Sequence, residues 1–243
     1  MAGNWIIIQA RMSSTRLPGK VLLPLGGLTS LEYVVRRCQN VPSAAGVMVA
    51  TTIHSEDDAI EVWCDSRNVR CVRGSKDDVL SRYLLAAKTV DPEYIIRVTS
   101  DCPFISYELL ETGLLLAADK KPDVVRWRMT SPVSRGILPE IIKASVLRDS
   151  EEIAQLERFR EHVTLYIWEQ LQNYAVEDVY LPSELLLGEY RITLDEPDDY
   201  RLLCTIADYF KGNLDVPTAE VIRYLKEHPQ IALMNAHVQQ KMP

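Results

Sequence analysis

The chain has 243 residues, 47% of them hydrophobic and 25% charged, as is typical of a globular protein with one large domain. Its net charge of −7 argues against nucleic-acid binding, and no apolar run is long enough for a transmembrane helix. No signal peptide is apparent, and the five cysteines are scattered without a Cys-x-x-Cys pair. We therefore expect a cytoplasmic protein with reduced thiols that binds neither nucleic acid nor a membrane.

The first half of the chain alternates apolar, β-branched runs with amphipathic stretches. It predicts strands at 5–10, 46–50, 69–72 and 93–98 and helices at about 29–39, 55–66, 77–89 and 106–118. Strands that are separated by single helices indicate right-handed βαβ units and a mostly parallel sheet. We predict an α/β, Rossmann-like fold with a mixed, mostly parallel sheet.

The alternation breaks in the second half, at 128–189, and resumes after it. The elements predicted there are strands at 122–127, 173–180 and 190–194 and helices near 140–149, 155–171, 197–210 and 217–227. We expect 1–243 to be a single domain. Within it, 128–189 would be an inserted subdomain that serves an acceptor pocket or a subunit interface.

The clearest functional signal follows the first strand. Ile6, Ile7 and Ile8 read as a buried strand, and the loop beyond it is rich in Ser, Thr and Gly. This loop also carries Arg11, Arg16 and Lys20. Backbone amides and fixed cations just beyond a strand suit the oxygens of a triphosphate. Neither a Walker A nor a Gly-x-Gly-x-x-Gly motif is present, and the alternative is a solvated basic loop.

Two later strands are each followed by an acidic residue. Asp101 comes after the strand at 93–98, and Asp195 comes after the strand at 190–194. Carboxylates from two strand ends that face a cationic loop can hold Mg²⁺ against phosphates. The alternative is that each aspartate caps the helix that follows it. Cys102 has no assignable histidine base and is not expected to be a nucleophile.

These segments resemble the sugar cytidylyltransferases, above all the spore coat polysaccharide biosynthesis cytidylyltransferase family, which is related to the CMP-Kdo and acylneuraminate cytidylyltransferases. The stretches that carry the resemblance are 8–11, 14–20, 49–52, 73–75, 77–80, 97–99, 101–103, 160–164 and 195–199. The resemblance implies a nucleotide-diphospho-sugar transferase fold, which is GT-A-like. It also implies Mg²⁺-dependent transfer of CMP from CTP to a sugar acid, with release of pyrophosphate, for cell-surface polysaccharide biosynthesis.

The resemblance also implies roles for individual residues. The catalytic residues would be Arg11, Lys20, Asp101 and Asp195, and the two aspartates would bind the metal. The nucleotide would contact Gln9, Ala10, Arg11, Ser13, Ser14, Thr15, Arg16, Lys20, Thr51, Thr52, Arg73, Gly74, Ser75, Asp78, Arg82, Thr99 and Asp101. For some of these, a structural role stays open: a helix cap for Ser75, and surface ion pairs for Arg73, Asp78 and Arg82.

The acceptor is expected to be an anionic small molecule, such as a keto sugar acid, because an arginine fork matches a carboxylate. The residues predicted to bind it are Arg126, Arg128, Arg135, Glu140, Arg160 and His162. Many relatives have an acid at the position of Leu138, and its loss favours an acceptor with fewer hydroxyls or more negative charge.

Three other functions stay open on the sequence. One is CMP transfer to a phosphonate or another anionic acceptor. A second is a GT-A-type glycosyltransferase with a nucleotide-sugar donor, although such enzymes commonly hold metal through Asp-x-Asp, which this chain lacks. The third is a non-catalytic nucleotide-binding module, which an intact set of loop cations and strand-end aspartates disfavours.

A homodimer is expected, with its contact in the middle segment. An apolar stripe at near-helical spacing there could form the interface, or it could pack on the protein's own sheet. The stripe consists of Ile153, Leu156, Phe159, Val163, Tyr166 and Ile167. The related sugar cytidylyltransferases are dimers, which favours the interface.

Overall fold

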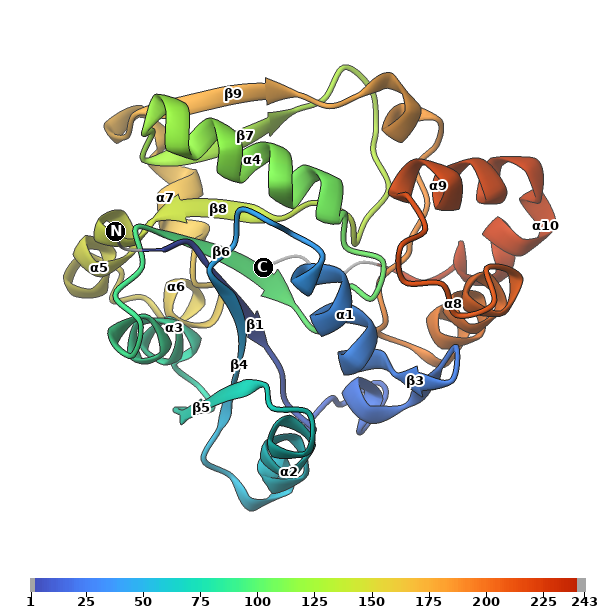
Figure 1. Ribbon diagram of the computed structural model, residues 1–243, viewed down its shortest axis with the longest axis horizontal. Helices are drawn as coiled ribbons and strands as arrows, with labels where there is room; N and C mark the ends of the chain where they lie inside the picture. Colours follow the sequence, from blue (N-terminus) through green and yellow to red (C-terminus); the bar gives the residue numbers. More distant parts are fainter. Residues whose placement is uncertain (1–2, 240–243) are drawn as a thin grey trace.

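A seven-stranded sheet runs through the computed structural model, which describes residues 3–239 (Figure 1). The strand order is β5-β4-β1-β6-β8-β7-β9. The strands are β1 (Trp5–Gln9), β4 (Gly46–Thr52), β5 (Arg70–Gly74), β6 (Tyr94–Thr99), β7 (Val124–Arg128), β8 (Glu140–Lys143) and β9 (Val176–Tyr180). All neighbouring pairs are parallel except those that β8 makes with β6 and β7. The predicted α/β, mostly parallel sheet is therefore confirmed.

Helices cover both faces of this sheet, so the central strands are apolar on both sides. Ile6 and Ile8 of β1 belong to one core cluster, and Ile7 belongs to the other. This is why the first strand reads as a continuous apolar run rather than an alternating one. The first cluster includes α1 (Ser30–Gln39), α2 (Asp58–Ser66) and α4 (Tyr107–Lys120), and α1 and α4 lie in front of the sheet in Figure 1. The second includes α3 (Val79–Lys88) and α5 (Ala144–Ile153).

The helix predicted near 140–149 was wrong at its start. Residues Glu140–Lys143 form β8, and α5 begins only at Ala144. The apolar pair Ile141 and Ile142 fits a strand because the two side chains point into opposite core clusters. The region 128–189 therefore supplies both β8 and β9 to the sheet that contains β1.

The single helix predicted at 155–171 was also wrong. It is divided into α6 (Glu157–Glu161) and α7 (Leu165–Glu169). Between them Val163 has a φ of 40°, in the left-handed region that a β-branched residue rarely adopts. Helical hydrogen bonding cannot continue through such a residue, so the chain turns at His162.

The predicted strand at 190–194 reduces to one bridge, between Arg135 and Arg191. The predicted helices after it are confirmed as α8 (Pro197–Tyr209) and α9 (Thr218–Glu227). The smaller elements are β2 (Pro24–Leu25), β3 (Leu28–Thr29), α10 (Pro229–Ala232) and the 3-10 helices Lys20–Leu22, Ser55–Asp57, Leu171–Asn173, Ser183–Leu186 and Leu233–Asn235.

The apolar stripe of the middle segment is divided between core and surface. Phe159, Val163 and Ile167 pack in the core cluster that contains α3 and α5, as the alternative to an interface predicts. Ile153 and Leu156, in contrast, are each 58% exposed. Within residues 3–239, no helix has both the length and the apolar character needed to cross a membrane.

Candidate active site

A cavity of about 390 Å³ opens beyond the carboxyl ends of β1 and β6. We call it the loop cavity because the segment after β1 forms much of its wall. It brings together residues that are far apart in the sequence, including all four predicted catalytic residues. Its lining residues are Gln9, Ala10, Arg11, Ser13, Ser14, Thr15, Arg16, Lys20, Val21, Val79, Arg82, Arg97, Thr99, Ser100, Asp101, Glu161, His162 and Asp195.

The loop after β1 is held in place by a buried carboxylate. Asp57 is fully buried; it accepts a hydrogen bond from the Met12 amide at 2.6 Å and another from the hydroxyl of Thr52. At the far end of the loop, the Gly19 amide donates to the Met12 carbonyl at 3.0 Å, with Gly19 at a φ of 69°. Thr52 therefore acts on the loop through Asp57, which had no predicted role in the site.

Lys20 lies between the two predicted metal-binding aspartates. Its Nζ is 2.8 Å from Oδ1 of Asp195 and 3.6 Å from Oδ2 of Asp101, and it donates to the Leu194 carbonyl at 2.6 Å. Arg16 reaches the same Asp195 oxygen at 3.1 Å. Burial opposes ionisation of Asp195, but Lys20, Arg16 and Arg191 outweigh it and lower the pKa of that carboxyl. Asp195 is therefore an anion at neutral pH.

Neither Asp101 nor Asp195 caps a helix, so the alternative that each aspartate is a helix cap is wrong. The N-cap of α4 is Ser106, whose hydroxyl accepts from the Leu109 amide, and the residue that precedes α8 is Glu196. Both carboxylates approach a single Lys20 nitrogen, so their oxygens can converge on one cation. Residues 3–239 contain no cluster of three or more His, Cys, Asp or Glu suited to a metal. Two carboxylates completed by substrate phosphates and water fit Mg²⁺.

Two cations of the loop cavity have no carboxylate partner in the described part of the chain. Arg11 is exposed, with no ion pair. Arg82 is only 2% exposed; its Nη1 donates to the Ser75 carbonyl at 3.0 Å, and its buried Nε has no partner. Burial lowers the pKa of Arg82, which indicates that the cation lacks full compensation. Such a group favours a bound anion.

Several predicted nucleotide residues lie outside the wall of this cavity. Arg73 ties α2 to β5 through Asp58 and Glu61, both at 2.6 Å. Asp78 caps α3 by accepting from the Ser81 amide at 2.9 Å, and the Ser75 hydroxyl accepts from the Asp78 amide. The remaining three, Thr51, Thr52 and Gly74, lie on β4 and β5.

The residues predicted to bind the acceptor do not form one group. Arg126 and Glu140 line a second cavity, Arg135 lines a third and His162 lines the loop cavity. Arg160 lines none of the three; it pairs with Asp78, at 2.9 Å from Nε and 2.5 Å from Nη2. Arg128 is exposed on β7.

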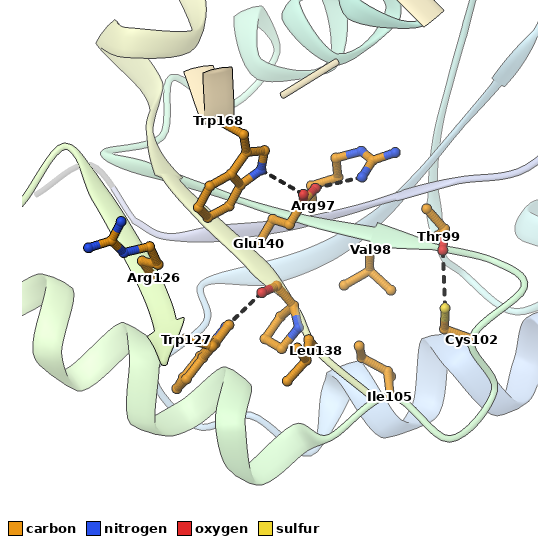
Figure 2. Close-up of a pocket in the computed structure, with 11 residues that line it drawn as sticks. Arg97, Val98, Thr99, Cys102, Ile105, Arg126, Trp127, Leu138, Glu140 and Trp168 are labelled. Atoms are coloured by element: carbon orange, nitrogen blue, oxygen red, sulfur yellow. Dashed lines mark hydrogen bonds and ion pairs between the residues drawn. The ribbon is translucent and has the colours of Figure 1, made fainter. Parts of the chain in front are cut away.

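The second cavity, about 310 Å³, is lined by residues of β6, β7 and β8, near the point where β7 and β8 stop pairing (Figure 2). We call it the strand cavity. β6 pairs with β8 as far as Arg97 and Glu140, whereas β7 pairs with β8 only at Val124 and Val125. The two sides of the sheet therefore separate beyond that point. Arg97 and Thr99 line both the strand cavity and the loop cavity, so the two cavities share a wall.

Glu140 is the hydrogen-bonding centre of the strand cavity. It accepts from Arg97 Nη1 at 2.5 Å, from Thr164 at 3.0 Å and from the Trp168 indole at 2.8 Å. Figure 2 shows its carboxylate between Arg97 and Trp168. Burial disfavours the charge of Arg97, but Glu140 outweighs this and raises the pKa of the guanidinium. Arg97 had no predicted role, although it begins one of the stretches that carry the family resemblance.

Cys102 lines the strand cavity and the third cavity, and its surroundings do not favour a nucleophile. Burial raises the pKa of its thiol well above the ordinary value, and the neighbouring Asp101 raises it further. A reactive cysteine needs the opposite shift. The expectation that this thiol has no covalent role agrees with its surroundings.

Comparison with known proteins gives matches that span the chain. A sequence model described as "Cytidylyltransferase" matches residues 5–235. The spore coat polysaccharide biosynthesis protein SpsF of Bacillus subtilis is 35% identical over 93% of this chain and 95% of its own length. A cytidylyltransferase structure from Leptospira borgpetersenii covers 100% of both chains, with 31% identity and a TM-score of 0.88.

A more distant structure shares the fold. It is a CMP:2-keto-3-deoxy-manno-octonic acid synthetase solved with CTP, and it has a TM-score of 0.65 and 17% identity over 86% of this chain and 100% of its own. The full-length matches decide between nucleotidyl transfer and the glycosyltransferase alternative. This chain belongs to the cytidylyltransferase family and is a nucleotidyltransferase with a GT-A-like fold.

Proposed function

We propose that this protein transfers CMP from CTP to a keto sugar acid and releases pyrophosphate, for the biosynthesis of a cell-surface polysaccharide. The observation that carries the proposal is the convergence of Lys20, Arg16, Asp101 and Asp195 in one cavity. The same cavity holds Arg11 and Arg82, which have no carboxylate partner within residues 3–239. CTP as the donor is supported by the nucleotide in the related synthetase, and the pathway is supported by the name of the Bacillus relative.

The chemistry needs positioning and charge neutralisation more than covalent catalysis. The triphosphate lies along the loop after β1, where Arg11, Arg82 and the loop amides bind its oxygens. The acceptor hydroxyl attacks the α-phosphorus in line and releases its proton to water. The bond to the bridging oxygen breaks, and pyrophosphate leaves with the negative charge that Lys20 and Arg16 stabilise.

Asp101 and Asp195 would hold a divalent cation, Mg²⁺, in this reaction. The ion would supply positive charge to the α-phosphate. Lys20 occupies the space between the two carboxylates in the structure, so it has to turn toward the phosphates when the ion and substrate bind. Its long flexible side chain permits this movement.

Pyrophosphate release tests the proposal. The purified protein is incubated with Mg²⁺, each of the four nucleoside triphosphates and a panel of keto sugar acids. We expect release only with CTP together with an acid acceptor, and loss of release when the metal is chelated. Release with a different triphosphate, or no release with any acid, would contradict the proposal.

A further inference from the structure

Arg126, Arg160 and Arg97 differ in how the binding edge of the guanidinium is used. The Nε and Nη2 atoms of a guanidinium form the edge that grips a carboxylate with two parallel hydrogen bonds. In Arg126 both atoms bind Asp178, at 2.5 and 2.6 Å. In Arg160 both atoms bind Asp78. These two edges are filled by the protein's own acids.

Arg97 is the contrasting case. Its hydrogen bond within residues 3–239 is made by Nη1, to Glu140 at 2.5 Å. Its Nε is buried and has no partner among those residues. Leaving a buried donor unpaired is unfavourable, and in native proteins such a group calls for an explanation. A ligand on the Nε–Nη2 edge provides one.

Glu140 fixes the orientation of the Nε–Nη2 edge of Arg97. Its other hydrogen bonds, to Thr164 and Trp168, fix the carboxylate that holds Arg97 Nη1. Glu140 neutralises the charge of Arg97, so the pair offers a ligand two directed N–H donors rather than a net positive charge, and one carboxylate can accept from both. A triphosphate matches the uncompensated cations of the loop cavity better.

We propose that the Nε–Nη2 edge of Arg97 binds the carboxylate of the acceptor and selects sugar acids over neutral sugars. Glu140 is then a positioning residue. The inference rests on the proposed function, because it needs an acid acceptor. Arg97 lies on the wall shared by both cavities. The bound carboxylate is therefore next to the attacking hydroxyl, as in a 2-keto acid, while the sugar body extends into the strand cavity toward Leu138.

The test compares each acid with its own neutral analogue. The probes are 3-deoxy-manno-octulosonate and N-acetylneuraminate, each paired with the analogue in which the carboxylate is reduced to a primary alcohol. We expect wild-type kcat/KM to favour the acid by about 10²-fold. In Arg97→Gln the preference should fall below about threefold, with the Kd for CTP within about twofold of wild type. The matched control is Arg158→Gln, which breaks an exposed pair with Glu169; neither residue lines any of the three cavities.

A second variant controls for the possibility that Arg97→Gln fails to fold. Arg97→Lys keeps the charge beside Glu140 but lacks the two-pronged edge, so it should also lose the preference for the acid. An unchanged preference in both variants would overturn the assignment while leaving the proposed function intact. Loss of CTP binding with an unchanged acceptor KM would overturn it in favour of a nucleotide role. A wild-type enzyme that uses neither acid would refute the proposed acceptor class and the Arg97 assignment with it.

Discussion

The loop cavity and the strand cavity differ in whether their cationic side chains are paired with carboxylates of the protein. In the loop cavity, Arg11 and Arg82 have no carboxylate partner in the described chain, and Lys20 and Arg16 share acids that can also bind a metal. Arg126, which lines the strand cavity, and Arg97, on the wall that the two cavities share, each pair with an acid. The comparison shows that a sequence rich in arginine does not by itself make an anion-binding site. An anion can be bound only by guanidinium N–H donors that no acid of the protein occupies after folding.

Lys20→Ala should have the largest effect, because it removes the cation that bridges the two aspartates and contacts phosphate in the transition state. We expect kcat/KM to fall by about 10²-fold or more, and Arg11→Ala to act in the same direction. Steady-state pyrophosphate assays measure this. Near-wild-type turnover in both variants would remove the phosphate role of the loop.

Arg82→Gln sharpens the comparison, since Arg82 is a buried cation of the loop cavity with no carboxylate partner within residues 3–239. Loss of a charged hydrogen bond to phosphate should raise the Kd for CTP by about 10- to 100-fold. Titration calorimetry with CTP and Mg²⁺ gives the value. Arg158→Gln is the control, because its partner is an exposed acid. An equal, small change in both variants would contradict the anion site at Arg82.

Asp101→Asn and Asp195→Asn test the metal. Each removes one anionic ligand, so the metal concentration for half-maximal activity should rise by about tenfold or more. Activity is measured against Mg²⁺ concentration, with circular dichroism as the control for folding. If half-saturation stayed the same in both variants, the carboxylates would have another role.

The dimer prediction concerns the exposed part of the middle segment. Light scattering at micromolar concentration should give twice the mass of one chain. Ile153→Asp with Leu156→Asp should give the single-chain mass, because two charges would enter an apolar contact. A monomeric wild-type protein would refute the prediction.

The loss of folding stability at acidic pH should depend in part on Asp195, whose pKa is lowered in the folded protein. A carboxyl with a depressed folded pKa stabilises the fold above its unfolded pKa and loses that contribution as pH falls through the folded value. The free energy of unfolding should therefore drop below about pH 4, and it should drop by more in wild type than in Asp195→Asn. Urea titrations at pH 3 and 7 measure it. Identical slopes with pH would contradict the ion-paired state of Asp195.

The sequence predicted the parallel part of the fold well and the middle segment poorly. Apolar runs such as Ile6 to Ile8 specify a doubly covered strand without tertiary information. The strand at Glu140–Lys143 and the turn at Val163 depend on packing against β6 and on a strained φ, which periodicity does not encode. At the site, strand-end positions predicted Lys20, Asp101 and Asp195. Arg97 was missed because its open edge is a property of the folded hydrogen-bond network.

Isotope transfer is the most direct test of the central claim, that CMP moves from the loop cavity to an acceptor. The enzyme is given CTP labelled either at the α- or at the γ-phosphate, together with Mg²⁺ and a keto sugar acid. We predict that the α-label appears on the sugar and the γ-label in pyrophosphate, and that Lys20→Ala transfers neither at a comparable rate. Transfer of the γ-label to the acceptor, or retention of the α-label on free nucleotide, would contradict the account.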